Sequence, residues 1–279
     1  MSLTPFCKDN GSTLYQGDCI VGMRLMPESL YDIIVTSPPY AIGKEYEKEQ
    51  SYGDYLRLIS DMYEVGYKII KPGGYCVIVM AEYYKFGGDK TIFMPTEYLH
   101  HIIAERHGWM HKCTRIWQKD FASLSDPYTI ESNLPKLEAE LIFFFRKPGG
   151  PKETVREQQL HTHAIWSTNG EKQSTPTLKH HPAAYPESLV NMILTVYSDK
   201  GDTVVDPFAG GGTTLVIAKR MGRRGIGFEL REDYCELAKL RLSQQEFQLD
   251  TPTLTRQMSI EDALNAQRVA EELRIPADF

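Results

Sequence analysis

Thr203-Val204-Val205-Asp206-Pro207-Phe208-Ala209-Gly210-Gly211-Gly212-Thr213-Thr214 is the most informative segment of this chain. It begins with apolar, β-branched residues, which are typical of a buried parallel strand. Glycines then let the backbone turn sharply and approach a ligand, and the start of a helix offers unpaired N–H groups. The segment therefore predicts a strand, a loop that wraps a small charged cofactor, and a helix over 213–221.

The residues on either side extend the alternation of strands and helices. Strands are expected near 14–15, 31–36, 75–80, 112–117, 140–146 and 224–229, and helices over 52–70, 96–107, 232–243 and from Pro186 onward. Pro and Gly at 71–74 end the helix over 52–70. This βαβ alternation predicts an α/β fold with a mostly parallel sheet and helices on both faces.

Two common glycine-rich motifs do not match the loop. A phosphate-binding P-loop needs Gly-Lys-Ser/Thr, whereas Gly212 is followed directly by Thr213. A dinucleotide-binding loop needs a glycine at 213 or 215, where Thr213 and Leu215 stand. Glu229, at the end of the next strand, can accept both hydroxyls of a ribose. These features favour a nucleoside-containing cofactor of another kind.

A second motif, Ser37-Pro38-Pro39-Tyr40, follows the strand over 31–36. Two prolines cannot continue a strand or join a helix interior, so they form a rigid extended corner. The Ser37 hydroxyl and the Pro38 carbonyl can hold both hydrogens of a ring amine and stabilise the charge that grows when it is alkylated. Tyr40 offers a flat face for an extruded base. The motif therefore predicts catalysis at an amino group.

Together the two motifs resemble those of the amino-group DNA methyltransferases, over roughly residues 13–245. The Ser-Pro-Pro-Tyr motif precedes the glycine-rich one, as in the circularly permuted β group of that family. The resemblance implies a Rossmann-like methyltransferase fold, S-adenosyl-L-methionine as cofactor, and double-stranded DNA as partner. It also implies that the target-recognition insert is the irregular segment at about 148–180, and that a homodimer can form.

The resemblance also assigns residues to roles. Asp206, Phe208 and Gly210 would line the methionine and adenosine pocket, Glu229 would hold the ribose, and Asp18 would contact the adenine edge. The predicted site consists of catalytic Ser37, Pro38, Pro39 and Tyr40 and cofactor-binding Asp18, Asp206, Pro207, Phe208, Gly210, Gly212, Thr213 and Glu229.

The target base follows from Ser37. Family members that act on adenine usually carry Asp or Asn at this position, and Ser is commoner in those that act on cytosine N4. We therefore expect transfer to N4 of a flipped cytosine, with adenine N6 as the alternative. A cytosine C5 enzyme would need a Pro-Cys nucleophile, which this chain lacks. More distant alternatives are a non-catalytic DNA- or cofactor-binding protein, a nicotinamide oxidoreductase, and an enzyme that methylates an RNA or protein amine.

Composition sets further limits on the 279-residue chain. Its five widely spaced cysteines form no C-x-x-C pair, and its histidines lack partner ligands, so neither a disulfide frame nor a metal site is expected. With no membrane span or signal peptide in the sequence, we expect a cytoplasmic protein of the prokaryotic cytosol or nucleoid. We expect a catalytic domain over 1–249 and a polar, partly helical tail over 250–279.

The formal net charge of −6 is a weak guide to nucleic-acid binding, which depends on local patches. Basic residues gather at Arg146-Lys147, Lys152, Arg156, Lys179-His180-His181, Lys219-Arg220 and Arg223-Arg224. Each cluster taken singly is expected to be a solvated face.

Overall fold

The computed structural model describes residues 3–39, 52–81, 83–86, 92–118, 139–151, 165–168 and 186–244. The chain divides into two units, Met1–Gln245 and Glu246–Phe279. All described residues lie in the first unit, and the fold below is the fold of that unit.

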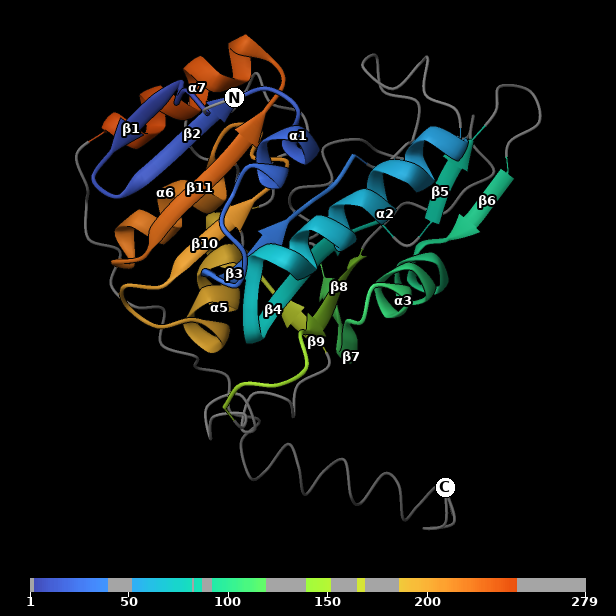
Figure 1. Cartoon of the computed structure of the whole chain (residues 1–279). Coiled ribbons are helices and arrows are strands. Elements are labelled where there is room, and N and C mark those ends of the chain that lie inside the picture. The colour runs from blue at the N-terminus through green and yellow to red at the C-terminus, as the bar shows by residue number, and fades with distance from the viewer. Residues whose placement is uncertain are drawn as a thin grey trace, which may run out of the picture. The chain divides into compact units, whose positions relative to one another are not determined.

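A nine-stranded sheet forms its centre (Figure 1). In spatial order its strands are β1 (Cys7–Asp9), β2 (Ser12–Gln16), β11 (Arg224–Glu229), β10 (Thr203–Asp206), β3 (Tyr31–Thr36), β4 (Ile70–Met80), β8 (Ala139–Arg146), β7 (Met110–Gln118) and β9 (Ile165–Ser167). Every neighbouring pair from β2 to β4 is parallel, as is β7 with β9. Strand β8 is antiparallel to both neighbours, and β1 is antiparallel to β2. The prediction of a mostly parallel sheet is confirmed.

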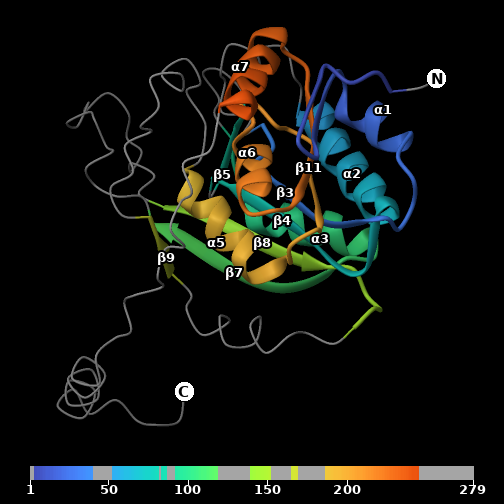
Figure 2. The same ribbon diagram turned by 90° about the vertical axis from the view of Figure 1, so that its left-hand side faces the viewer.

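Helices cover both faces of this sheet (Figures 1 and 2). One face carries α1 (Cys19–Arg24), α2 (Tyr52–Ile69) and α3 (Thr96–Arg106), and the other carries α5 (Glu187–Tyr197), α6 (Thr213–Arg220) and α7 (Glu232–Ser243). A separate hairpin of β5 (Tyr83–Phe86) and β6 (Ile92–Pro95) lies beside α3. In the described part of the chain, no helix has the length and apolar character needed to cross a membrane.

The core explains why the central strands have continuous apolar sequences. Along β3, Ile34 packs in the cluster beneath α1 and α2, whereas Ile33 and Val35 pack in the cluster beneath α5 and α6. Successive side chains of a strand point to opposite faces, so a sheet covered on both sides needs apolar residues at every position. All three side chains are fully buried.

The expected elements agree closely with the observed ones. Strands 31–36, 203–206 and 224–229 coincide with β3, β10 and β11, and helix 232–243 coincides with α7. The structure adds β1, α1, the β5–β6 hairpin and β9, which the sequence pattern did not predict.

Candidate active site

The predicted site residues that the structure describes, all but Tyr40, lie where four adjacent parallel strands end. In spatial order these strands are β2, β11, β10 and β3, and their last residues are Gln16, Glu229, Asp206 and Thr36. We call the residues 16–18, 36–39, 206–213 and 229–231 the carboxyl edge. In open α/β sheets, ligands bind at this edge, and here it collects both sequence motifs.

A buried hydrogen bond joins the two motifs. Thr36 Oγ1 donates to Asp206 Oδ1 over 2.6 Å, and Phe208 N donates to the same oxygen over 3.1 Å. Thr36 is fully buried and Asp206 is 1% exposed. Strand β3 lies directly beside β10, with Ile34 paired to Val205. The residue before Ser37 is therefore fastened to the first residue of the glycine-rich motif.

The glycine-rich loop is held in a shape that side chains would oppose. Gly210 and Gly212 have φ values of 50° and 78°, in the left-handed region that favours glycine. A Cβ on Gly212 would lie 2.8 Å from Ala238 Cβ on α7. Gly212 N donates to Ala209 O, and Ala209 N donates to Phe228 O. The loop is thus packed against α7 and attached to β11.

Glu229 lies at the centre of the carboxyl edge. Its Oε2 accepts from Gly210 N and its Oε1 accepts from Arg231 N, both over 2.9 Å. Burial raises the pKa of this carboxyl above its usual range, although the two N–H donors act in the opposite direction. Each carboxylate oxygen has a second lone pair, so the group can accept further hydrogen bonds from a ligand.

Asp18 is exposed at the end of β2 and caps helix α1, because its side chain accepts from Val21 N over 2.9 Å. The preceding Gly17 donates its N–H to Glu229 O over 2.8 Å, which brings the Gly17-Asp18 turn beside Glu229. The capping bond gives Asp18 a structural role that is independent of any ligand.

The Ser-Pro-Pro-Tyr motif is described as far as Pro39. Pro38 is buried, and Ser37 and Pro39 are partly buried. Tyr40 lies outside the described residues, as do 152–164 and 169–180 of the predicted recognition insert.

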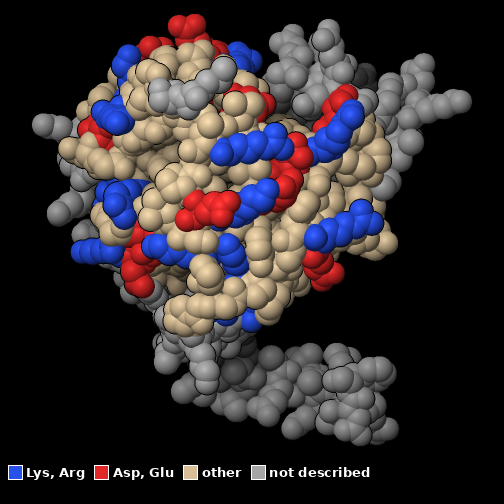
Figure 3. All heavy atoms as spheres, viewed as in Figure 1, with Lys and Arg blue, Asp and Glu red and all other residues tan. Residues whose placement is uncertain are grey.

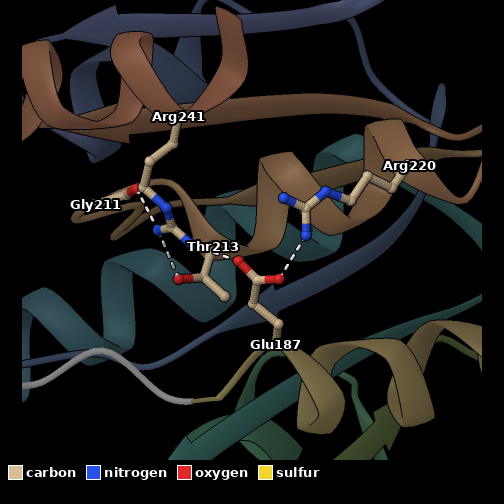
Figure 4. Close-up of polar contacts among 5 residues, drawn as sticks. All are labelled: Glu187, Gly211, Thr213, Arg220 and Arg241. Atoms are coloured by element: carbon tan, nitrogen blue, oxygen red, sulfur yellow. Dashed lines mark hydrogen bonds and ion pairs between the residues drawn. The ribbon is translucent and has the colours of Figure 1, made fainter. Parts of the chain in front are cut away.

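Sequence reasoning missed an ionic network that touches the glycine-rich loop (Figure 4). Arg241 Nη1 donates to Gly211 O over 2.6 Å and to Thr213 Oγ1 over 3.0 Å. Glu187 accepts from Arg241 over 2.9 Å and from Arg220 over 2.5 Å. These residues begin or end helices that are distant in sequence, so periodicity and motif spacing carry no signal of the contact.

In the described region, most of the basic clusters contain a buried or partly buried side chain that donates hydrogen bonds to backbone carbonyls. This corrects the expectation that each cluster is a solvated face. Lys147 Nζ donates to the carbonyls of Tyr67 and Ile70, and Arg223 donates to those of Leu194, Ser198 and Met221. Lys152, Arg156 and Lys179-His180-His181 lie outside the described residues.

The face that carries α1 and α2 mixes both signs of charge (Figure 3). Arg24 pairs with Asp61, and Lys68 pairs with Glu64. Paired charges of this kind partly cancel each other's field. Within the described residues, no group of three or more His, Cys, Asp or Glu could hold a metal ion, and the five cysteines are free thiols.

Comparison with known proteins identifies the family. A family model described as DNA methylase, which covers N6 and N4 enzymes, matches residues 31–240. The chain belongs to this family. It is a methyltransferase that uses S-adenosyl-L-methionine and acts on exocyclic amino groups of DNA.

Similar proteins support the same assignment for this DNA methylase. The Type II methyltransferase M.ScaI of Streptomyces caespitosus is 25% identical over 258 residues, which cover 86% of this chain and 84% of the relative. A putative DNA modification methylase of Thermus thermophilus, solved with S-adenosyl-L-methionine, is 28% identical with a TM-score of 0.63 over 82% of this chain and 92% of its own. The cytosine-N4-specific PvuII DNA methyltransferase has a TM-score of 0.72 at 18% identity, covers 98% of this chain and 96% of its own, and shows the shared fold.

Proposed function

We propose that this DNA methylase transfers the methyl group to N4 of a cytosine flipped out of duplex DNA, and that the carboxyl edge holds both the cofactor and the base. One observation carries the proposal, namely the buried hydrogen bond between Thr36 and Asp206. It fixes the beginning of the Ser-Pro-Pro-Tyr motif against the beginning of the glycine-rich loop. A methyl donor bound at the loop would then lie beside an amine held at Ser37.

The carboxyl edge suits S-adenosyl-L-methionine in shape and charge. Gly210 and Gly212 permit a close backbone approach, and Glu229 retains acceptor capacity for two ribose hydroxyls. Asp206 adds a second carboxyl group within the loop's own hydrogen bonds. Two acidic side chains favour a ligand that carries ammonium and sulfonium charges. We assign Pro207, Phe208 and Thr213 to the wall of the same site.

The proposed chemistry needs little from the protein beyond positioning. S-adenosyl-L-methionine, when bound, supplies an electrophilic methyl carbon on sulfur. The Ser37 hydroxyl and the Pro38 carbonyl accept the two amine hydrogens and direct the nitrogen lone pair away from the ring. The N–C bond would form as the C–S bond breaks, which would leave the sulfur as a neutral thioether, and the methylated nitrogen would then release one proton to water. Tyr40 stacks on the extruded base.

Ser37 favours cytosine N4 over adenine N6, because family members acting on adenine usually carry Asp or Asn there. Because duplex DNA is the proposed substrate, we propose that the protein works in the prokaryotic cytosol or nucleoid. Asp18 is proposed to contact the adenine edge of the cofactor. The homodimer implied by the family resemblance stays a prediction, which sedimentation velocity tests.

Mass spectrometry of labelled nucleosides tests the proposal. The protein is incubated with methyl-deuterated S-adenosyl-L-methionine and genomic DNA from a host without DNA methylases, and the DNA is then digested to nucleosides. We expect the label in N4-methylcytosine, and its loss with Ser37→Ala. Label in N6-methyladenine would replace the cytosine assignment with the alternative. Label in neither nucleoside would contradict transfer to an amino group.

A further inference from the structure

Arg241 fastens the glycine-rich loop from outside the carboxyl edge. It lies in the last turn of α7, and its side chain is only 3% exposed. Its Nη1 donates to the Gly211 carbonyl and to the Thr213 hydroxyl. Gly212, the N-cap of α6, has no side chain with which to cap that helix. The guanidinium only donates, so it does not cap the N–H groups of α6; it holds the loop through the carbonyl before Gly212 and the hydroxyl after it.

Glu187 holds Arg241 in this orientation. Its Oε1 accepts from Arg241 Nη2 over 2.9 Å, and its Oε2 accepts from Arg220 Nη1 over 2.5 Å. Figure 4 shows the carboxylate between the two guanidinium groups, with Arg241 turned toward Gly211 and Thr213. Arginine stays charged in proteins, so a buried guanidinium needs such a partner. Glu187 thus acts on the loop through Arg241.

From this geometry we propose that Glu187 and Arg241 are positioning residues for the methyl donor. The inference rests on the proposed function, because it takes the glycine-rich loop as the cofactor site. Arg241 reaches the carboxyl edge through the Gly211 carbonyl and the Thr213 hydroxyl, and Glu187 reaches it through Arg241. Their contribution is to keep the loop in its binding shape before the cofactor arrives, which lowers the ordering cost of binding.

The proposal is tested with the full chain by measuring S-adenosyl-L-methionine affinity by calorimetry and thermal stability separately. Arg241→Met keeps an unbranched side chain but removes all donors. We expect it to raise the dissociation constant about tenfold or more, as for the loss of charge-assisted hydrogen bonds. Arg241→Lys keeps the positive charge but loses the planar set of guanidinium donors, so its affinity should lie between those of Arg241→Met and the wild type. Glu187→Gln should weaken binding by a smaller factor.

Arg223→Met is the matched control. Arg223 is also a buried arginine that donates to backbone carbonyls, but the carbonyls of Leu194 and Ser198 that it binds are at the end of α5. It should lower the melting temperature while leaving the affinity within about twofold of wild type. An equal loss of affinity in this control would mean that the effect is general destabilisation, and would overturn the proposal.

A third variant separates this inference from the proposed function. Glu229→Ala removes the carboxylate assigned to the ribose. If it abolishes binding while Arg241→Met and Glu187→Gln bind normally, the positioning role is wrong and the cofactor site stands. If Glu229→Ala also binds normally, the site itself is wrong. If Arg241→Met does not fold, the affinities of Glu187→Gln and Arg241→Lys for S-adenosyl-L-methionine test the inference. Wild-type affinity in both of these variants would overturn it.

Discussion

Thr36 donates a 2.6 Å hydrogen bond to Asp206, a residue 170 positions away in the sequence. The bond is buried, and it lies between the last residues of two neighbouring parallel strands. One strand leads into Ser37 and the other into the glycine-rich loop. The spacing between the proposed amine site and the proposed methyl-donor site is therefore set by the register of β3 and β10 and locked by this bond.

Thr36→Val is expected to disturb both stability and catalysis. The substitution keeps the β-branched shape but removes the donor, which leaves a buried carboxyl group with one hydrogen bond fewer. The free energy of unfolding should fall by about 1.5–3 kcal/mol, and kcat/KM should fall at least about tenfold. Thr36→Ser retains the hydroxyl and serves as the control. Urea unfolding and methyl-transfer assays check this, and wild-type catalysis by Thr36→Val would contradict it.

Gly212→Ala should be much more harmful than the same change at Gly201. Both glycines have positive φ, 78° and 89°, but the new Cβ would lie 2.8 Å from Ala238 at position 212 and meets nothing within 4 Å at position 201. We expect a loss of about 1–2 kcal/mol at Gly201 from backbone strain alone. Overpacking adds about 1–3 kcal/mol at Gly212. Equal stability of the two variants in thermal unfolding would argue against tight packing of the loop on α7.

The affinity for S-adenosyl-L-methionine should fall in mild acid. Ribose hydroxyls donate to the ionised form of Glu229, and burial raises the pKa of this group above the ordinary 4.5. Binding is therefore strongest at neutral pH, and it weakens as the pH falls through that raised pKa. Calorimetry between about pH 7 and about pH 5 measures the effect. The Glu229→Gln variant should bind S-adenosyl-L-methionine more weakly, and its affinity should not change over this pH range. If the affinity of the variant falls with pH as steeply as that of the wild type, the titrating group is not Glu229.

His100 should make the fold sensitive to acid. It is fully buried between Tyr63 and Phe143, it shares a 2.8 Å hydrogen bond with Tyr63 Oη, and burial lowers its pKa from 6.5 to about 3. The unfolded chain binds a proton below pH 6.5 that the folded chain does not bind until about pH 3. Stability is therefore lost as the pH falls through this window, by about 1.4 kcal/mol per unit.

Urea unfolding of a His100→Gln variant checks this prediction. The amide can still hydrogen-bond to Tyr63 but does not titrate. Between about pH 6 and about pH 4, the free energy of unfolding should change less steeply with pH in the variant than in the wild type. The difference in slope should correspond to one fewer proton taken up on unfolding. Identical slopes would show that His100 does not limit acid stability.

Most of the fold was predictable because its central strands and helices have strong local patterns. The apolar run before Asp206 and the helical spacing over 52–70 each determine an element from adjacent residues. The Pro and Gly at 71–74, expected to separate that helix from a strand over 75–80, instead lie within β4, which begins directly after α2. The elements that escaped prediction are short. Strand β1 has three residues and α1 has six, so neither is long enough to show a hydrophobic period. Their places are set by pairing with β2 and by the Asp18 cap.

The proximity of the two motifs was predictable for the same reason, since both follow predictable strands, and the roles assigned to their residues stay predictions. Contacts between distant segments were not predictable. Thr36 was visible only as the last residue of a strand, and the partner of its hydroxyl depends on which strand lies beside β3. Glu187 begins α5 and Arg241 lies in the last turn of α7, and nothing in either local sequence indicates their contact. Long-range polar pairs need the three-dimensional arrangement.

A crystal structure of the protein with S-adenosyl-L-methionine tests the site most directly. We predict that the ribose hydroxyls lie within hydrogen-bond distance of the Glu229 carboxylate, with the methyl group facing the side of the carboxyl edge that carries Ser37. A cofactor bound away from Glu229 and the 206–213 loop would contradict this.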